Sequence, residues 1–207
     1  MKHIFTLFLI GITIAAGAQC SGNRYVNQIF PSVDVTVDIT YGNNINQAGA
    51  AQSLELDVYE GTGDIETSRP LLIMAHGGSF IGGSKEATDV VDICTDFAKM
   101  GYVCTSIEYR IGMDGIPFPG PDSVDATESV IRAFHDMKAA IRFFYKDARE
   151  NGNNYGIDTN QIFIGGSSAG AIAAVHVAYL DDISELPSYV DTTAAGLGGG
   201  IAGQSGN

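Results

Sequence analysis

The sequence is poor in basic residues. Its 207 residues include 11 lysines and arginines against 24 aspartates and glutamates, which gives a formal net charge of −13 at pH 7. Nucleic acids and anionic membranes both attract basic protein surfaces, and the sequence has no cluster of lysine and arginine. The composition therefore argues against a nucleic-acid partner and against binding to an anionic membrane surface.

Long hydrophobic runs are equally scarce. The one at the N-terminus, residues 4–14, follows Lys2 and precedes the small residues 16–18. A run of this length is too short to cross a bilayer as a helix, and the whole pattern is typical of a signal peptide. We therefore predict a signal peptide over residues 1–18, a mature domain over 19–207, export to the periplasm or the extracellular space, and no membrane span.

Cysteine is rare as well, with Cys20, Cys94 and Cys104 as its three occurrences. A lipid anchor at Cys20 is disfavoured because a large polar residue, Gln19, precedes it. Three cysteines at these separations do not form a metal site, and we predict neither a metal nor a cofactor. In an exported protein, Cys94 and Cys104 could form a disulfide, since they fall in elements expected to be neighbours. Two buried thiols are the alternative.

Two segments near the N-terminus alternate strictly between apolar and polar residues. Residues 33–41 are apolar at the odd positions, and residues 54–59 alternate in the same way. A period of two predicts half-buried strands, with one face on a core and the other in water. Because a polar loop of small residues joins them, the two strands predict an antiparallel hairpin at the edge of a sheet.

From about residue 70 onward, buried strands and helices alternate. We expect strands at 71–75, 103–109 and about 162–164, and helices at 85–100 and 123–149. This alternation is typical of an α/β fold, in which helices cover both faces of a mostly parallel sheet.

The predicted helix at 123–149 carries an apolar stripe with steps of three and four residues, which indicates packing on the sheet. The charged residues between the stripe positions, Asp136 among them, are expected on a solvated face. The stripe consists of Val130, Phe134, Met137, Ile141, Phe144 and Ala148.

Residues 166–170 read Gly-Ser-Ser-Ala-Gly, a G-x-S-x-G pattern between a predicted buried strand and a predicted helix. A sharp turn at such a place can expose a side chain at its tip only where the neighbouring residues are very small. Gly166, Ala169 and Gly170 give this clearance, and the following helix would point its positive end at the site. The pattern predicts that Ser168 is a nucleophile; a plain glycine-rich turn is the alternative.

A second glycine-rich segment follows the predicted strand at 71–75. Residues 76–80 read His-Gly-Gly-Ser-Phe. Attack of a serine on an ester passes through a tetrahedral oxyanion, which needs preorganised hydrogen-bond donors. We predict that the backbone N–H groups of Gly77 and Gly78 serve as these donors, together with the N–H of Ala169. A flexible turn is the alternative.

The two motifs together resemble the α/β-hydrolase family, and within it the carboxylesterase and hormone-sensitive-lipase-like branch. Two further segments support the resemblance: residues 106–110, Ser-Ile-Glu-Tyr-Arg, and residues 156–158, Gly-Ile-Asp. The resemblance extends over roughly residues 50–203. It implies an α/β-hydrolase fold, with a mostly parallel sheet, an antiparallel N-terminal hairpin and helices on both faces.

The resemblance also assigns supporting roles within the motifs. It implies that His76 acts structurally at the start of the oxyanion loop, and that Gly166 and Gly170 shape the turn around the serine. The family's loop often has a third consecutive glycine, where this sequence has Ser79. The role of oxyanion donor is therefore not extended to Ser79.

The family's catalytic acid and histidine follow the serine in chain order, and this sequence lacks such a pair. His176 comes after Ser168, but eight residues of helix place it about 12 Å further along the axis, too far for a hydrogen bond. His76 precedes the serine at the oxyanion loop, His135 falls on the long helix, and His3 falls in the leader. None of them is expected to be the base.

We therefore expect the acid and the base to lie beyond residue 207. The chain is expected to stop near a strand around Leu197–Ile201, which would leave the fold incomplete at its C-terminus. The predicted function is an exported serine hydrolase of small carboxylic esters. A non-catalytic binding protein on the same scaffold and a serine peptidase of the same fold are the alternatives. The sequence does not indicate an oligomeric state.

Overall fold

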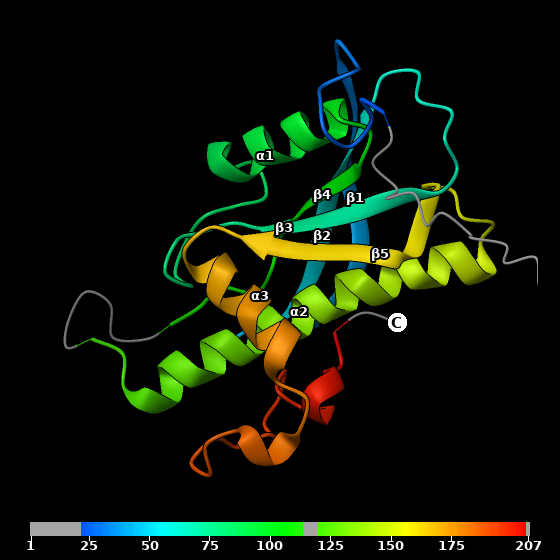
Figure 1. Cartoon of the computed structure of the whole chain (residues 1–207). Helices are drawn as coiled ribbons and strands as arrows, with labels where there is room; N and C mark the ends of the chain where they lie inside the picture. The colour runs from blue at the N-terminus through cyan, green and yellow to red at the C-terminus, as the bar shows by residue number, and fades with distance from the viewer. Residues whose placement is uncertain (1–21, 114–119, 206–207) are drawn as a thin grey trace, which may run out of the picture.

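The computed structural model describes residues 22–113 and 120–205, with a five-stranded sheet in the order β1-β2-β4-β3-β5 at its centre (Figure 1). The strands are β1 (Val33–Ile45), β2 (Ala51–Gly61), β3 (Arg69–Ala75), β4 (Val103–Ile107) and β5 (Ile157–Gly166). The helices are α1 (Thr88–Lys99), α2 (Ser123–Glu150) and α3 (Ala169–Tyr179), followed by the short 3₁₀ turns η1 (Ile183–Glu185) and η2 (Gly200–Ala202).

The sheet is antiparallel at one end and parallel at the other. Strand β1 pairs antiparallel with β2, and β2 pairs antiparallel with β4. Strand β3 runs parallel to both β4 and β5, and its last residue, Ala75, is level with Ile107 on β4 and Gly166 on β5. The predicted N-terminal hairpin and α/β fold are confirmed. Because these carboxyl ends are level, the loops that follow them meet at one edge of the sheet.

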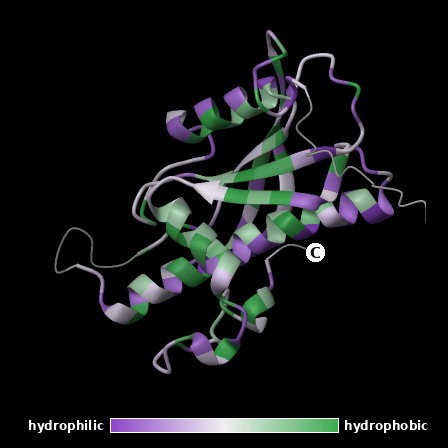
Figure 2. Cartoon of the chain, viewed as in Figure 1, coloured by the Kyte–Doolittle hydropathy of each residue, from purple (hydrophilic) through white to green (hydrophobic). Residues whose placement is uncertain are grey.

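Alternate residues of β3 explain why helices cover both faces. Leu72 and Met74 join a cluster that is completed by α1, whereas Leu71 and Ile73 join the larger core under α2 and α3. Figure 1 shows α1 on one side of the sheet and the other two helices on the opposite side. In Figure 2, α1 and α2 each carry hydrophobic and hydrophilic residues along their length, as helices with one face on a core do.

The edge strand β1 is less buried than its alternation predicts. Val35 and Val37 are 46% and 57% exposed, whereas Tyr41 is 1% exposed. The pairing with β2 is irregular between Thr36 and Ile39, and Asp38 adopts a left-handed backbone with φ 58°. A bulge of this kind twists an edge strand and changes the side to which its residues point. The prediction of a half-buried strand therefore fails for the first part of β1.

Cys94 and Cys104 are free thiols in the cluster between α1 and the sheet. Both side chains are fully buried, and burial raises the pKa of the Cys94 thiol to about 12. A buried thiol with a raised pKa is unreactive and packs as a small apolar group. Of the two predicted alternatives, the structure has the pair of buried thiols.

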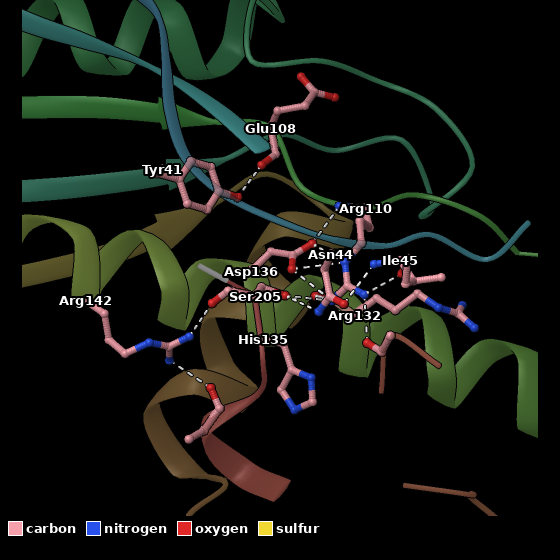
Figure 3. Close-up of polar contacts among 12 residues, drawn as sticks. Tyr41, Asn44, Ile45, Glu108, Arg110, Arg132, His135, Asp136, Arg142 and Ser205 are labelled. Carbon is pink, nitrogen blue, oxygen red and sulfur yellow. Dashed lines mark hydrogen bonds and ion pairs between the residues drawn. The ribbon is translucent and has the colours of Figure 1, made fainter. Parts of the chain in front are cut away.

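Asp136 on α2 is buried, so its expected place on a solvated face is wrong. Its carboxylate accepts hydrogen bonds from Nε of Arg110 at 2.9 Å and from the Arg110 backbone N–H at 2.8 Å. Both side chains are 0% exposed. Figure 3 shows the two side chains together, with these hydrogen bonds dashed. Nη1 of Arg110 donates to the carbonyl groups of Ile45 and Gly196, and Nη2 donates to Oδ1 of Asp136 and to Oγ of Ser205. Periodicity could not predict this because the partner lies on another element.

The expected strand around Leu197–Ile201 does not form. Gly199 and Gly200 have φ values of 94° and 60°, which are incompatible with a strand, and a 3₁₀ turn occupies Gly200–Ala202. This segment instead packs on α2, where Lys138 donates to the carbonyl of Ile201 at 3.0 Å. A run of glycines has no side chains with which to pair in a sheet, so contacts with α2 decide its conformation.

His135 is one of the residues that this C-terminal segment covers, and it makes stability depend on pH. Its Nε2 donates to the carbonyl of Gly200 at 2.8 Å, and burial lowers its pKa from 6.5 to about 4. Between these two pH values the unfolded chain binds the proton and the folded chain does not. The contribution of His135 to the free energy of unfolding is therefore fully present above the unfolded pKa and is lost as the pH falls toward the folded pKa.

We therefore expect the free energy of unfolding to decrease by about 2 kcal/mol between pH 7 and pH 5 through His135. Urea unfolding of the wild type and of His135→Gln at both pH values gives the decrease in the free energy of unfolding from pH 7 to pH 5 for each protein. The contribution of His135 is the difference between these two decreases. Carboxylates that also titrate in this range are common to both proteins. Equal decreases in the two proteins would show that the buried imidazole has no such effect.

In residues 22–113 and 120–205, we find no helix with the length and apolar character that crossing a membrane requires. The predicted signal peptide and Cys20 lie outside the described residues.

Candidate active site

Ser168 stands at the turn between β5 and α3, where it is the N-cap residue of the helix. Its backbone has φ 47° and ψ −110°, a left-handed conformation that is rare for a residue with a side chain. Holding such a conformation costs on the order of 1–3 kcal/mol, and residues held in this way cluster at functional sites. The side chain is exposed, while Ala169 and Gly170 directly after it are buried.

The glycines beside Ser168 are required by close backbone contacts. A Cβ on Gly170 would lie 2.1 Å from the carbonyl oxygen of Ala75, and one on Gly166 would lie 2.3 Å from the backbone of Gly170. The N–H of Ser167 also donates to the Ala75 carbonyl at 3.0 Å. The turn is therefore pressed against the end of β3, and this contact fixes the position of Ser168.

The predicted oxyanion loop lies directly beside the serine. A Cβ built on Gly77 would lie 3.3 Å from Cβ of Ser168 and 3.3 Å from the carbonyl oxygen of Ser167. In the described part of the chain, no acceptor takes a hydrogen bond from the N–H groups of Gly77, Gly78 or Ala169. These donors remain available to a ligand.

The loop after Gly77 closes on itself. Gly78 has φ 117°, and its carbonyl accepts hydrogen bonds from the N–H groups of Ile81 and Gly82. Ser79 and Phe80 also have left-handed backbones, with φ values of 55° and 60°. Ser79 is exposed, whereas Phe80 is buried and packs edge-on against Tyr109. The aromatic ring thereby anchors the tip of a loop that otherwise consists of small residues.

His76 lies at the start of this loop, and its imidazole is 0% exposed. The ring stacks on Tyr109, with centroids 4.2 Å apart, and the Tyr109 hydroxyl donates to the His76 carbonyl at 2.9 Å. Nδ1 lies 2.7 Å from the carbonyl oxygen of Gly77, so it carries a proton and donates it to that oxygen. His76 therefore braces the loop with both its ring and its backbone.

The other histidines of the described chain are also engaged in contacts away from Ser168. His135 is buried under the C-terminal segment, as described above. Nδ1 of His176 donates to the Ile172 carbonyl of its own helix at 2.8 Å.

The acidic residues after α3 cap local turns. Asp182 accepts from the N–H of Ser184, Glu185 completes the same capping box, and Asp191 accepts from Thr193. These backbone and side-chain hydrogen bonds lower the pKa of Asp182 and that of Asp191. We find no acid–histidine pair at Ser168 among residues 22–113 and 120–205.

Two polar residues near the loop were not predicted from the sequence. Lys85 is 5% exposed, and its Nζ lies 2.8–2.9 Å from carboxylates of Asp38, Asp57 and Glu86. Glu108, at the end of β4, accepts the backbone N–H of Lys85 at 2.9 Å. Lys85 is separated from its partners by up to 47 positions, so no local pattern indicates the cluster.

No group of three or more histidine, cysteine, aspartate or glutamate side chains in the described ranges could hold a metal ion. The geometry around Ser168 is instead that of an exposed hydroxyl beside free backbone donors. This arrangement can in principle deliver a nucleophile to a carbonyl carbon and hold the oxyanion that results.

Comparisons with known proteins identify similar chains. A family model described as BD-FAE matches residues 56–196, more than half of the chain. The chain is 28% identical to "Lipase 1" of Geotrichum candidum over 155 residues, which cover 73% of this chain and 24% of that protein. It is 31% identical to "Gut esterase 1" of Caenorhabditis elegans over 102 residues, 49% of this chain and 17% of that protein.

Among solved structures, the butyrate-bound esterase Est2 of Thermogutta terrifontis matches 70% of this chain and 44% of its own, with 24% identity and a TM-score of 0.48. The chain spans about a quarter of the length of the curated lipases that it matches.

Proposed function

The chain belongs to the BD-FAE family of α/β-hydrolases, and from this membership we propose that it carries the nucleophile and the oxyanion hole of an enzyme that hydrolyses carboxylic esters. Ser168 is the proposed nucleophile. Gly77, Gly78 and Ala169 are the proposed oxyanion donors. The observation that carries the proposal is the contact between Gly77 and Ser168, which brings together two motifs that are separated by about 90 residues of sequence.

The proposed reaction has two halves. Oγ of Ser168 attacks the carbonyl carbon while a base takes its proton, and the carbonyl oxygen becomes an oxyanion held by the backbone donors. The bond to the alcohol then breaks, the alcohol leaves with the proton from the base, and an acyl-serine remains. Water, deprotonated by the same base, then attacks the acyl carbon. The bond between the acyl group and Oγ breaks, the base returns the proton to Oγ, and the carboxylic acid is released.

The position of Ala169 supports its part in this reaction. Its N–H is the first of helix α3, where backbone N–H groups have no partner within the helix. The dipole of the helix adds a partial positive charge at the same end, which stabilises a developing anion. Both effects act at the residue directly after Ser168, close to the carbonyl that the serine would attack.

We further propose that the base and its orienting acid lie beyond residue 207. His76, His135 and His176 are each held by other contacts, and a serine without a base is a weak nucleophile. The relatives' greater length is compatible with this proposal. A small-molecule ester is the proposed substrate. We also propose that the predicted signal peptide directs export of the protein to the compartment where this substrate is found.

Covalent labelling of the full-length protein with a fluorophosphonate tests the proposal. These reagents phosphonylate an activated serine, and fragmentation of the labelled peptide by mass spectrometry identifies the residue. We expect stoichiometric label on Ser168. Label on another serine would reject the assignment, and a folded protein that takes up no label would favour a binding role on the same scaffold.

A further inference from the structure

The carboxylate of Glu108 contacts both ends of the oxyanion loop. Its Oε2 accepts the backbone N–H of Lys85 at 2.9 Å, and its Oε1 lies 3.6 Å from Nε2 of His76. The oxyanion loop is part of the segment between β3 and α1; His76 begins this segment and Lys85 lies near its end. Glu108 itself sits at the end of β4, next to the strand from which the loop emerges. One side chain therefore spans the base of the segment that carries Gly77 and Gly78.

At the His76 end, Glu108 faces a buried nitrogen that has no other partner. Because Nδ1 of His76 donates to the Gly77 carbonyl, Nε2 is the free nitrogen of the ring. It is buried and has no hydrogen bond among the described residues. A buried polar atom of this kind is costly unless it is paired. At 3.6 Å, Oε1 of Glu108 is too far for a strong hydrogen bond; it attracts a ring that carries protons on both nitrogens and repels the Nε2 lone pair of a neutral ring.

At the other end, Lys85 is fixed by more than its backbone. Its ammonium binds Asp38 on β1 and Asp57 on β2, so the residue whose N–H Glu108 accepts is itself attached to the sheet. The backbone of Glu108 is attached as well, because its N–H donates to the carbonyl of Glu55 on β2 at 2.8 Å. Both partners of the hydrogen bond between Glu108 and Lys85 are therefore rigidly placed.

The geometry points to Glu108 as a positioning residue of the oxyanion hole. By accepting the hydrogen bond of Lys85 and lying against the ring of His76, it closes the loop at its base and holds Gly77 against Ser168 with its N–H free. This inference rests on the proposed function, because it gives Glu108 its role through the oxyanion donors. Glu108 acts through the loop and does not itself touch the reacting atoms.

Three substitutions distinguish the contacts that Glu108 makes with both ends of the loop from the effect of its negative charge. Glu108→Ala removes both contacts. Glu108→Asp keeps the charge but is one methylene too short to reach both ends. Glu108→Gln loses the charge but keeps the length, since its oxygen can accept from Lys85 and its amide can donate to Nε2 of His76.

For the full-length protein and a short-chain nitrophenyl ester, we expect kcat to fall about 10–100-fold in Glu108→Ala and about 10-fold in Glu108→Asp, because small displacements of oxyanion donors are costly. Glu108→Gln should stay within about threefold of wild type, and KM should change less than about threefold in all three. Glu55→Ala, a half-buried carboxylate on the neighbouring strand, is the matched control and should match wild type. If Glu108→Asp were as active as wild type and Glu108→Gln were inactive, the negative charge of Glu108 would matter and its two contacts would not.

Hydrogen exchange provides a readout that does not depend on catalysis. The amides of Ile81 and Gly82, which bond to the Gly78 carbonyl, report whether the loop keeps its turn. Their exchange should accelerate about tenfold or more in Glu108→Ala and remain unchanged in Glu108→Gln. Unchanged exchange in Glu108→Ala and Glu108→Asp would overturn the inference. If Glu108→Ala fails to fold, the other two variants decide. If Ser168→Ala keeps its activity, the proposed function fails, while the exchange results still test the bridge.

Discussion

Replacing Ser168 by alanine in the full-length protein is expected to lower kcat for ester hydrolysis by about 10⁴-fold or more. In the proposed reaction the Ser168 hydroxyl is the group that forms the acyl bond, so the alanine variant loses the nucleophile. The proposed oxyanion donors remain in this variant, so some catalysis over the uncatalysed reaction should persist. KM should change little because binding does not depend on the hydroxyl. Initial rates with a short-chain nitrophenyl ester measure both constants.

Ser167→Ala is the matched control for this experiment. Ser167 precedes the proposed nucleophile in the same turn, yet its backbone N–H is bonded to Ala75 and its φ is not left-handed. We expect this variant to lose less than about tenfold in kcat, since it changes no atom in the proposed reaction. If the two alanine variants were equally active, Ser168 would not be the nucleophile.

Replacing Asp136 by asparagine is expected to lower the free energy of unfolding by about 3–5 kcal/mol. The substitution leaves the guanidinium of Arg110 buried without its counter-charge, and the desolvation cost of that charge is then no longer offset. Urea unfolding followed by circular dichroism measures the change. Glu150→Gln, an exposed carboxylate at the end of the same helix, should change stability by less than about 0.5 kcal/mol.

A double variant tests whether the cost comes from the unpaired charge. Arg110→Met combined with Asp136→Leu replaces the pair by apolar side chains, and we expect it to be more stable than Asp136→Asn alone. A loss below about 1 kcal/mol in Asp136→Asn would contradict the importance of the pair. This pair matters for the proposed site because Arg110 follows Glu108 and Tyr109, which contact the oxyanion loop.

Much of the fold follows from local patterns. The helix predicted at 123–149 is α2 at Ser123–Glu150, and the strand predicted at 71–75 is β3 at Arg69–Ala75. These elements are strongly periodic or continuously apolar, so one packing arrangement is favoured from the start. The roles of Ser168 and its oxyanion donors remain predictions that the variants above will test.

The expectations that failed share a physical cause. Asp136 is charged and was expected in water, but its partner Arg110 comes from the segment that follows β4 and makes burial possible. The glycines near residue 200 were expected to extend a strand, but their backbone follows the surface of α2. In both cases a contact between remote segments overrides the local preference.

The local sequence is enough to predict a strand–turn–helix at Ser168 with small residues around the serine, because the steric constraints on such a turn act between neighbouring residues. It cannot reveal that the Glu108 carboxylate lies between His76 and Lys85, or that Arg110 meets Asp136 in the core. Those contacts exist only when separate strands and helices pack, since burial is what makes a polar group require a partner and the fold is what supplies that partner.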